Sequence, residues 1–218
     1  MDVQGAKTRN CSVVILGDSY STFEGYIPPH QKSYYPNPEK VPDLTLVEET
    51  WWYQLTARRN MRILRNDSYS GSTVCNHTRD GQPPESAFIR RMHGSLSVHG
   101  VDGEMPNVII IFGATNDSWL DREIGELKYA DWTQQELRCV LPAYCHLLDY
   151  VTKCNSRAAI YCVINDVLKP EIRDGIAKAA AHYGVHAVLL EGIEKSFGHP
   201  NVLGMTQIAQ QIERAMDN

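Results

Sequence analysis

The sequence predicts an α/β fold organised around a parallel β-sheet. Its strand candidates are short, unbroken apolar runs, a pattern typical of strands buried on both faces. Stretches with helical periodicity lie between these runs, so that strand and helix alternate along the chain. Several of the apolar runs also end in turns of small polar residues. Because parallel strands all end at the same edge of a sheet, these turns are expected to gather polar groups at that edge.

The first strand is expected at residues 13–16, Val-Val-Ile-Leu, and it ends in Gly17-Asp18-Ser19. The glycine permits a sharp turn that leaves Ser19 at the sheet edge, although these three residue types are also common in ordinary turns. Further strands are expected at about 61–65, 108–112, 158–164 and 185–190. The second strand is followed by a polar turn over 66–72 that contains Gly71, and the third is followed by a turn that contains Asn116.

The first helix is expected to begin at Thr45, because Thr45 and Glu48 have the spacing of a capping box. Val47, Trp51 and Leu55 recur at positions i, i+4 and i+8 and form an apolar stripe that faces a core.

Later helices are expected at 84–96, from 133 onward, at 170–183 and after residue 201. Pro84 suits the first position of a helix, and Gly184 suits the position just after one. Thr133 and Glu136 form a second capping box, and Pro142 is expected to kink the helix that this box opens.

Two long connections interrupt the alternation. Residues 24–45 are rich in proline and tyrosine and contain too many helix and strand breakers for a regular element. A connection of this length is often functional, and its aromatic rings suit a sugar or an apolar acyl group, but a plain surface loop pinned by tyrosines fits equally well. The second connection follows Asn116 and holds Trp119.

Length and composition limit the number of domains and the classes of function that the chain can have. At 218 residues the chain is expected to form one domain, 1–218, with the 24–45 loop as an insertion. A net charge of -5 does not favour binding to nucleic acid or to an anionic membrane. No stretch approaches a membrane span. We therefore expect a soluble protein, cytoplasmic as it stands, or secreted if a signal peptide has been removed. The oligomeric state is left open.

The cysteines and paired arginines are expected to be structural. The six cysteines include no Cys-x-x-Cys pair, and several lie in apolar contexts, as free buried thiols in a reducing compartment do. Cys75-Asn76-His77 matches no zinc spacing, so no metal is expected. The pairs Arg58-Arg59 and Arg90-Arg91 fall within helix candidates and are interpreted as solvated faces.

Four polar groups are expected to meet at the carboxyl edge of the sheet: the Ser19 hydroxyl, the Gly71 backbone N–H, the Asn116 side-chain amide and the His199 imidazole. Acyl transfer needs this inventory of a hydroxyl nucleophile, a base and convergent donors for an oxyanion. Taken singly, each residue also has a structural explanation, such as a turn or a helix cap. The chain has no Gly-x-Ser-x-Gly, P-loop, dinucleotide or His-Glu-x-x-His motif. This argues against an α/β-hydrolase, a nucleotide- or dinucleotide-binding protein and a zinc protease.

These blocks resemble those of the SGNH (GDSL-type) hydrolases. The blocks are Gly17-Asp18-Ser19-Tyr20-Ser21, Gly71, Gly113-x-x-Asn116-Asp117 and His199-Pro200-Asn201, and they follow the family's order over residues 12–216. The resemblance implies a flavodoxin-like three-layer α/β/α sandwich with five parallel strands. It also implies that Ser19 is the nucleophile and an oxyanion donor, that Gly71 and Asn116 complete the oxyanion hole, and that His199 is the base. Ser19 to Gly25 and Trp51-Trp52 look most like a bacterial branch with no assigned substrate.

The chain departs from that family at one position. Members usually carry an aspartate three residues before the histidine, where this chain has Ser196. Glu191, Glu194 and a backbone carbonyl remain as candidates for the group that orients His199.

The leading hypothesis is a serine esterase without a cofactor that cleaves a small O-acyl ester, such as an O-acetyl group on a carbohydrate. Tyr20, Asp117 and Trp119 are further candidates for substrate contacts. The alternatives are a non-catalytic carbohydrate-binding protein on the same fold and a lipase or thioesterase type of acyl hydrolase. A flavodoxin-like cofactor binder is a third alternative, since the turn after the first strand is rich in hydroxyls.

Overall fold

The computed structural model describes residues 11–95 and 105–217. Its main sheet has five parallel strands in the order β2-β1-β3-β4-β5. The strands are β1 (Ser12–Gly17), β2 (Arg62–Ser68), β3 (Val108–Phe112), β4 (Ala159–Ile164) and β5 (His186–Leu189). The expected parallel sheet is thereby confirmed, and its third strand has the predicted bounds.

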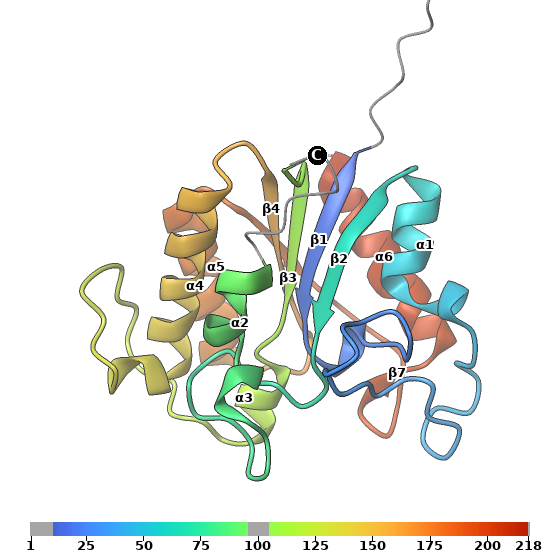
Figure 1. Cartoon of the computed structure of the whole chain (residues 1–218), viewed down its shortest axis with the longest axis horizontal. Helices are drawn as coiled ribbons and strands as arrows, with labels where there is room; N and C mark the ends of the chain where they lie inside the picture. The colour runs from blue at the N-terminus through green and yellow to red at the C-terminus, as the bar shows by residue number, and fades with distance from the viewer. Residues whose placement is uncertain (1–10, 96–104, 218) are drawn as a thin grey trace, which may run out of the picture.

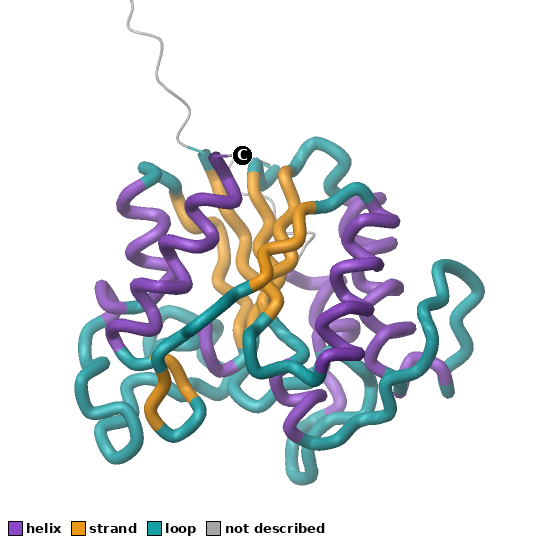
Figure 2. The backbone as a smooth tube through the Cα atoms, turned by 180° about the vertical axis from the view of Figure 1, so that it is seen from behind, coloured by secondary structure: helices purple, strands orange, loops and turns teal. Residues whose placement is uncertain are grey.

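Helices cover both faces of the sheet, so the molecule has three layers (Figure 1). One face carries α1 (Trp51–Arg58) and α6 (Val202–Asp217). The other carries α2 (Phe88–Ser95), α4 (Val140–Cys154) and α5 (Pro170–Tyr183). The same separation is visible from behind in Figure 2. The α/β/α sandwich implied by the resemblance is confirmed.

The core divides into two clusters, one on each side of the sheet, because successive strand side chains point to opposite faces. In β1, Val14 and Leu16 join one cluster while Val13 and Ile15 join the other. All six β1 residues are buried, as the unbroken apolar run predicts. Gly17 lies level with Ser68 of β2 and Phe112 of β3, so these three strands end together.

The predicted apolar stripe of the first helix is confirmed, but the predicted start is wrong. Trp51 and Leu55 are fully buried in the cluster beneath α1. However, α1 begins at Trp51, and Thr50 caps it by accepting the Tyr53 N–H at 3.4 Å. The capping-box sequence at Thr45 instead lies at a short 3₁₀ turn, η2 (Val47–Glu49), where the neighbouring Glu49 carboxylate accepts the Thr45 N–H.

Two other predicted helix starts open short 3₁₀ turns instead. Thr133 and Glu136 do form a reciprocal capping box, with the Thr133 N–H donating to Glu136 at 2.7 Å and the Glu136 N–H donating to Thr133 at 3.2 Å. It opens η4 (Glu136–Arg138), and α4 begins only at Val140. Pro142 thus lies in the first turn, where a proline removes no helical hydrogen bond, so the reason for the predicted kink is absent.

Pro84 likewise opens η3 (Pro84–Ser86) ahead of α2. Residue 96, where this helix was expected to end, lies outside the described residues. The closure of α5 by Gly184 is confirmed, with φ 65°.

Strand β2 is longer than predicted, because polar residues continue it. Asn66 and Asp67, expected in a turn, are buried strand residues. The Asn66 side-chain amide donates to the Ser21 carbonyl at 2.9 Å. Polar side chains satisfied in this way can remain in a buried strand, which periodicity in the sequence does not reveal.

The interpretation of Arg90-Arg91 as a solvated face is wrong for Arg91. Its guanidinium is buried and donates to the Asp67 carboxylate at 3.2 Å, to the Gly17 carbonyl at 3.1 Å and to the Ser72 hydroxyl at 3.3 Å. A helix residue therefore ties together the ends of β1 and β2 and the loop that contains Gly71. Arg90 is exposed, as expected.

Every cysteine in the described residues is a free thiol, and four of the six are buried. The described part of the chain contains no helix with both the length and the apolar character that crossing a bilayer requires.

Candidate active site

Ser19 begins the 3₁₀ turn η1 (Ser19–Ser21), and one residue, Asp18, separates it from the end of β1. The Asp18 carboxylate caps this turn by accepting the Tyr20 N–H at 3.0 Å. A Cβ atom on Gly17 would lie 2.5 Å from the Ser68 hydroxyl and 2.7 Å from Ser21 Cβ. Only glycine fits there, and the tight packing fixes the direction in which the chain leaves the strand.

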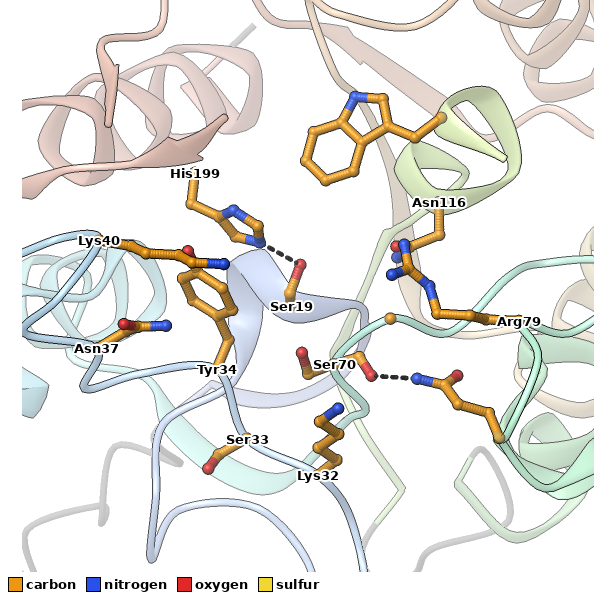
Figure 3. Close-up of a pocket in the computed structure, with 13 residues that line it drawn as sticks. Ser19, Lys32, Ser33, Tyr34, Asn37, Lys40, Ser70, Arg79, Asn116 and His199 are labelled. Atoms are coloured by element: carbon orange, nitrogen blue, oxygen red, sulfur yellow. Dashed lines mark hydrogen bonds between the residues drawn. The ribbon is translucent and has the colours of Figure 1, made fainter. Parts of the chain in front are cut away.

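His199 contacts Ser19, although the two residues come from opposite ends of the chain. The Ser19 hydroxyl lies 3.0 Å from His199 Nε2, although 180 residues separate the two in the sequence (Figure 3). His199 belongs to β7 (His199–Pro200), which forms a small antiparallel hairpin with β6 (Lys195–Ser196). Figure 1 shows β7 beyond the carboxyl ends of the main strands. The structure thus brings together the predicted hydroxyl and imidazole.

Tyrosines hold the His199 hairpin in place. The Tyr34 ring stacks on the imidazole with 3.6 Å between centroids and 6° between planes. Tyr35 donates its hydroxyl to the Pro200 carbonyl at 2.8 Å, and Tyr20 donates to the Gly198 carbonyl at 2.5 Å. Two of these tyrosines come from the 24–45 connection, so that loop supports the site.

The second ring nitrogen of His199 faces a backbone carbonyl. Nδ1 lies 3.4 Å from the Phe197 carbonyl oxygen, which makes this the partner among the three candidates for the missing aspartate. The side chains of Glu191 and Glu194 are exposed, and neither makes a hydrogen bond to His199 within the described residues. With Nε2 accepting the Ser19 hydroxyl, the proton of the neutral ring belongs on Nδ1.

Burial lowers the pKa of His199 to about 4, because the charged imidazolium loses hydration. The Phe197 carbonyl opposes this shift in the pKa, while the positive charges of Lys40 and Arg79 add to it. The imidazole is therefore neutral at pH 7, the form that can accept a proton from a hydroxyl.

Gly71 and Asn116 line the same cavity as Ser19. Gly71 has φ +84°, and a Cβ there would collide with the side-chain amide of Gln82. The Asn116 amide is almost fully buried and donates to the Ser72 carbonyl at 3.0 Å. An amide nitrogen carries two hydrogens, so one N–H of Asn116 remains for a ligand.

Asp117 and Tyr20, two of the three predicted substrate contacts, do not line the cavity. Both are fully buried. The Asp117 carboxylate accepts the backbone N–H groups of Val74 at 2.8 Å and Cys75 at 3.2 Å, which fastens the loop after β2 to the short helix α3 (Thr115–Trp119). These two side chains act as supports. Trp119 ends α3, where a loop was expected, and is 41% exposed.

The cavity in front of Ser19 has a volume of about 380 Å³. Its lining contains four of the predicted site residues and Trp119, together with residues that the sequence analysis did not single out, namely Lys32, Ser33, Asn37, Lys40, Ser70, Arg79 and Gln82. In Figure 3, Tyr34 and Lys40 lie on one side of the Ser19–His199 pair, and Asn116 and Arg79 lie on the other. The residues that the sequence analysis did not single out lie in irregular loops, which offer no periodicity from which to predict them.

The sequence profile of the GDSL-like lipase/acylhydrolase family matches residues 11–216, nearly the whole chain. A search of curated proteins found no match.

Two solved structures with substantial sequence identity share the fold. A protein from Bacteroides uniformis, provisionally described as a GDSL-like lipase, is 37% identical, with a TM-score of 0.86 over 95% of this chain and 96% of its own. A second, from Bacteroides ovatus and described in the same way, is 36% identical, with a TM-score of 0.86 over 95% and 98%.

A more distant structure shares the fold alone. It is a family two carbohydrate esterase from Clostridium thermocellum in complex with cellohexaose, 16% identical, with a TM-score of 0.63 over 95% of this chain and 64% of its own. The family profile and the two Bacteroides structures carry the assignment. The chain belongs to the GDSL-like lipase/acylhydrolase family of ester hydrolases.

Proposed function

We propose that this chain is a serine esterase in which Ser19 is the nucleophile and His199 the general base. The observation that carries the proposal is the 3.0 Å contact between the Ser19 hydroxyl and His199 Nε2 at the floor of a cavity. A nucleophile and a base within hydrogen-bond reach are the minimal requirement for this chemistry. The neutral imidazole, which follows from its lowered pKa, supplies the base in the required form.

The reaction proceeds in two halves. Ser19 Oγ attacks the ester carbonyl as its proton moves to His199 Nε2, and the tetrahedral intermediate then expels the alcohol, which takes that proton. Water next attacks the acyl-Ser19 ester as its proton moves to His199 Nε2. The bond to Ser19 Oγ then breaks, Oγ takes that proton back, and the carboxylic acid leaves. The backbone N–H groups of Ser19 and Gly71 and the amide of Asn116 donate to the oxyanion. Each such donor contributes about 3–4 kcal/mol to the transition state.

The Phe197 carbonyl takes the orienting role that a carboxylate has in a full triad. It accepts the Nδ1 proton and so keeps Nε2 free to act as the base. A carbonyl dipole stabilises the transient imidazolium less than a full negative charge does, and in a serine protease the loss of that charge costs roughly 10⁴-fold in kcat. Stacking on Tyr34 restrains the ring in addition. We expect turnover to be modest.

The substrate is a small O-acyl ester, with an O-acetyl group on a carbohydrate as the leading candidate. The cavity of about 380 Å³ is lined mostly by polar side chains, which suits a hydroxylated compound better than a long acyl chain. Tyr34 and Trp119 offer aromatic faces of the kind on which sugar rings pack. The distant carbohydrate esterase fold is consistent with this choice but adds only an analogy.

The test is hydrolysis of p-nitrophenyl acetate by the wild type, Ser19→Ala and Ser33→Ala. Ser33 lines the same cavity without contacting His199, which makes it the matched control. We expect Ser19→Ala to lower kcat/KM at least about 10³-fold and Ser33→Ala to change it less than about threefold. Equal rates in the wild type and Ser19→Ala overturn the proposal.

A non-catalytic carbohydrate-binding protein is the second candidate, favoured because, among the described residues, His199 Nδ1 faces a backbone carbonyl and not a carboxylate. It predicts that the wild type binds an oligosaccharide but neither turns over esters nor reacts with a fluorophosphonate. Rapid covalent labelling of Ser19 eliminates it.

A further inference from the structure

Positive charge is concentrated around the candidate cavity. In the part of the chain that the structure describes, the cavity lining contains Lys32, Lys40 and Arg79 and no carboxylate. The whole chain, by contrast, has 26 acidic against 21 basic residues and a net charge of -5. A local excess of cations on an acidic protein is a feature of this site and does not follow from composition.

The three cations approach the nucleophile from different sides. In Figure 3, Lys40 lies on the side of His199 and Tyr34, Arg79 lies on the side of Asn116, and Lys32 lies below Ser70. The nitrogen atoms of all three side chains point toward the space in front of Ser19. Lys32 is held there by its backbone, since its carbonyl accepts the Ser70 N–H at 2.8 Å.

Among the described residues, these cations have no counter-ion. Within residues 11–95 and 105–217, none of the three makes an ion pair with a carboxylate. Several other lysines do, including Lys128 with Glu136 and Lys195 with Asp166. Like charges that converge without a partner repel one another, and an anion in the shared space removes that repulsion.

We propose that the ester hydrolysed at this site carries a negative charge on its alcohol part, a carboxylate, sulfate or phosphate, that Lys32, Lys40 and Arg79 bind. This inference rests on the proposed esterase function. The acyl carbonyl must lie against Ser19, Gly71 and Asn116, so a small acyl group occupies the floor of the cavity. The three cations are exposed and so reach the larger half of the ester, which projects from the cavity. An acylated acidic sugar has this chemistry.

The field of the cations also extends to the reacting atoms. Lys40 and Arg79 both act on the His199 imidazole, where their charge lowers its pKa further. An anionic alcohol placed between them offsets their repulsion of the imidazolium that forms as Ser19 attacks. The charged substrate therefore improves the chemical step as well as binding, so the preference appears in kcat/KM.

The test compares aryl acetates that share the acetyl group and the phenyl ring and differ in the charge of the para substituent. The neutral substrate is methyl 4-acetoxybenzoate, and the anionic substrates are 4-acetoxybenzoate, 4-acetoxybenzenesulfonate and 4-acetoxyphenyl phosphate. Each kcat/KM is divided by the rate of alkaline hydrolysis of the same ester, which removes differences in leaving-group strength. The three anionic substrates distinguish carboxylate, sulfate-like and phosphate recognition.

We expect at least one anionic ester to be preferred by about tenfold or more over the neutral ester. The preference falls to within about twofold when Lys32, Lys40 and Arg79 are all replaced by Gln, and it weakens from 0.05 M to 1 M salt as the Debye length shortens to about 3 Å. Lys178→Gln changes an exposed lysine on α5 and is the control that retains the full preference.

No preference in the wild type, or the same preference in the triple variant, overturns the inference. So does a preference that appears only when the charge is on the acyl group, as in 4-nitrophenyl hemisuccinate.

Binding separates this inference from the esterase proposal. Ser19→Ala cannot form an acyl-enzyme, and calorimetry measures its affinity for the product anion 4-hydroxybenzoate and for methyl 4-hydroxybenzoate. Hydrolysis of neutral and anionic esters at equal rates leaves the esterase standing and overturns the anion site. Preferred binding of the anion, lost in the triple variant, together with no hydrolysis of any ester, overturns the esterase and leaves the anion site standing.

Discussion

The Tyr34 ring lies parallel to the His199 imidazole, with 3.6 Å between centroids and 6° between planes. Tyr34 comes from the proline-rich connection near the start of the chain, whereas His199 belongs to a hairpin near its end. This contact restrains the imidazole at a site where its second nitrogen faces a backbone carbonyl at 3.4 Å. The stacking thus supplies part of the restraint that a carboxylate gives elsewhere.

Replacing Tyr34 is therefore expected to affect catalysis through the ring and not through the hydroxyl. Tyr34→Ala removes the stacking surface, and we expect kcat to fall about tenfold or more on p-nitrophenyl acetate. Tyr34→Phe keeps the ring and removes a buried hydroxyl that has no hydrogen-bond partner in the described part of the chain, so kcat should stay within about twofold. A loss of the same size in both variants contradicts this role.

The pH dependence of kcat/KM should reflect the lowered pKa of His199. Only the neutral imidazole accepts the Ser19 proton, so activity is lost as pH falls through the pKa of about 4 and is retained above it. We expect a flat profile from pH 8 to about 5.5 and a decline below that, measured with circular dichroism at each pH to verify folding. An inflection near pH 6.5 indicates an imidazole exposed to solvent.

Gly71→Ala tests the position of the loop that carries an oxyanion donor. Gly71 has φ +84°, and its new Cβ would displace the Gln82 amide. Gly81 has φ +78° with no atom within 4 Å of its Cβ, so Gly81→Ala shares the backbone strain without the collision. We expect kcat to fall about tenfold or more in Gly71→Ala alone. Similar kinetics in both variants exclude Gly71 from the site.

The buried guanidinium of Arg91 should matter for stability. Arg91→Ala leaves the Asp67 carboxylate buried without this partner, and such losses cost about 3–5 kcal/mol in the free energy of unfolding. Arg90 is the adjacent control, since it is exposed and its guanidinium bonds only to the Asn76 side chain, at 3.0 Å, among the described residues. Urea titrations should show less than about 1 kcal/mol for Arg90→Ala. Equal losses in the two variants contradict the structural role of Arg91.

Much of the fold is predictable because parallel strands buried on both faces appear in the sequence as unbroken apolar runs. The run at 13–16 and the run at 108–112 are apolar throughout, and both prove to be central strands. Their ends locate Ser19 and Asn116 at one edge, which is why the polar groups of the cavity are predictable from strand order. His199 is placed by the same logic, through the loop that follows β5 (His186–Leu189).

The features that escaped prediction depend on tertiary contacts. Arg91 looks like any charged helix residue until Asp67 and the Gly17 carbonyl meet it in space. The sequence left the partner of His199 Nδ1 open among Glu191, Glu194 and a backbone carbonyl, and only the fold selects the Phe197 carbonyl, because a main-chain oxygen has no residue type to recognise. The cations of the cavity lie in irregular loops whose path is set by packing and not by periodicity.

The most direct measurement of the central claim is covalent capture of the nucleophile. The protein is treated with a fluorophosphonate, and the modified peptide is identified by mass spectrometry. A single adduct on Ser19 is expected in the wild type, with no adduct in Ser19→Ala, a strongly slowed reaction in His199→Ala and an unchanged rate in Ser33→Ala. An unmodified wild-type protein, or a label on another residue that persists in Ser19→Ala, contradicts the account.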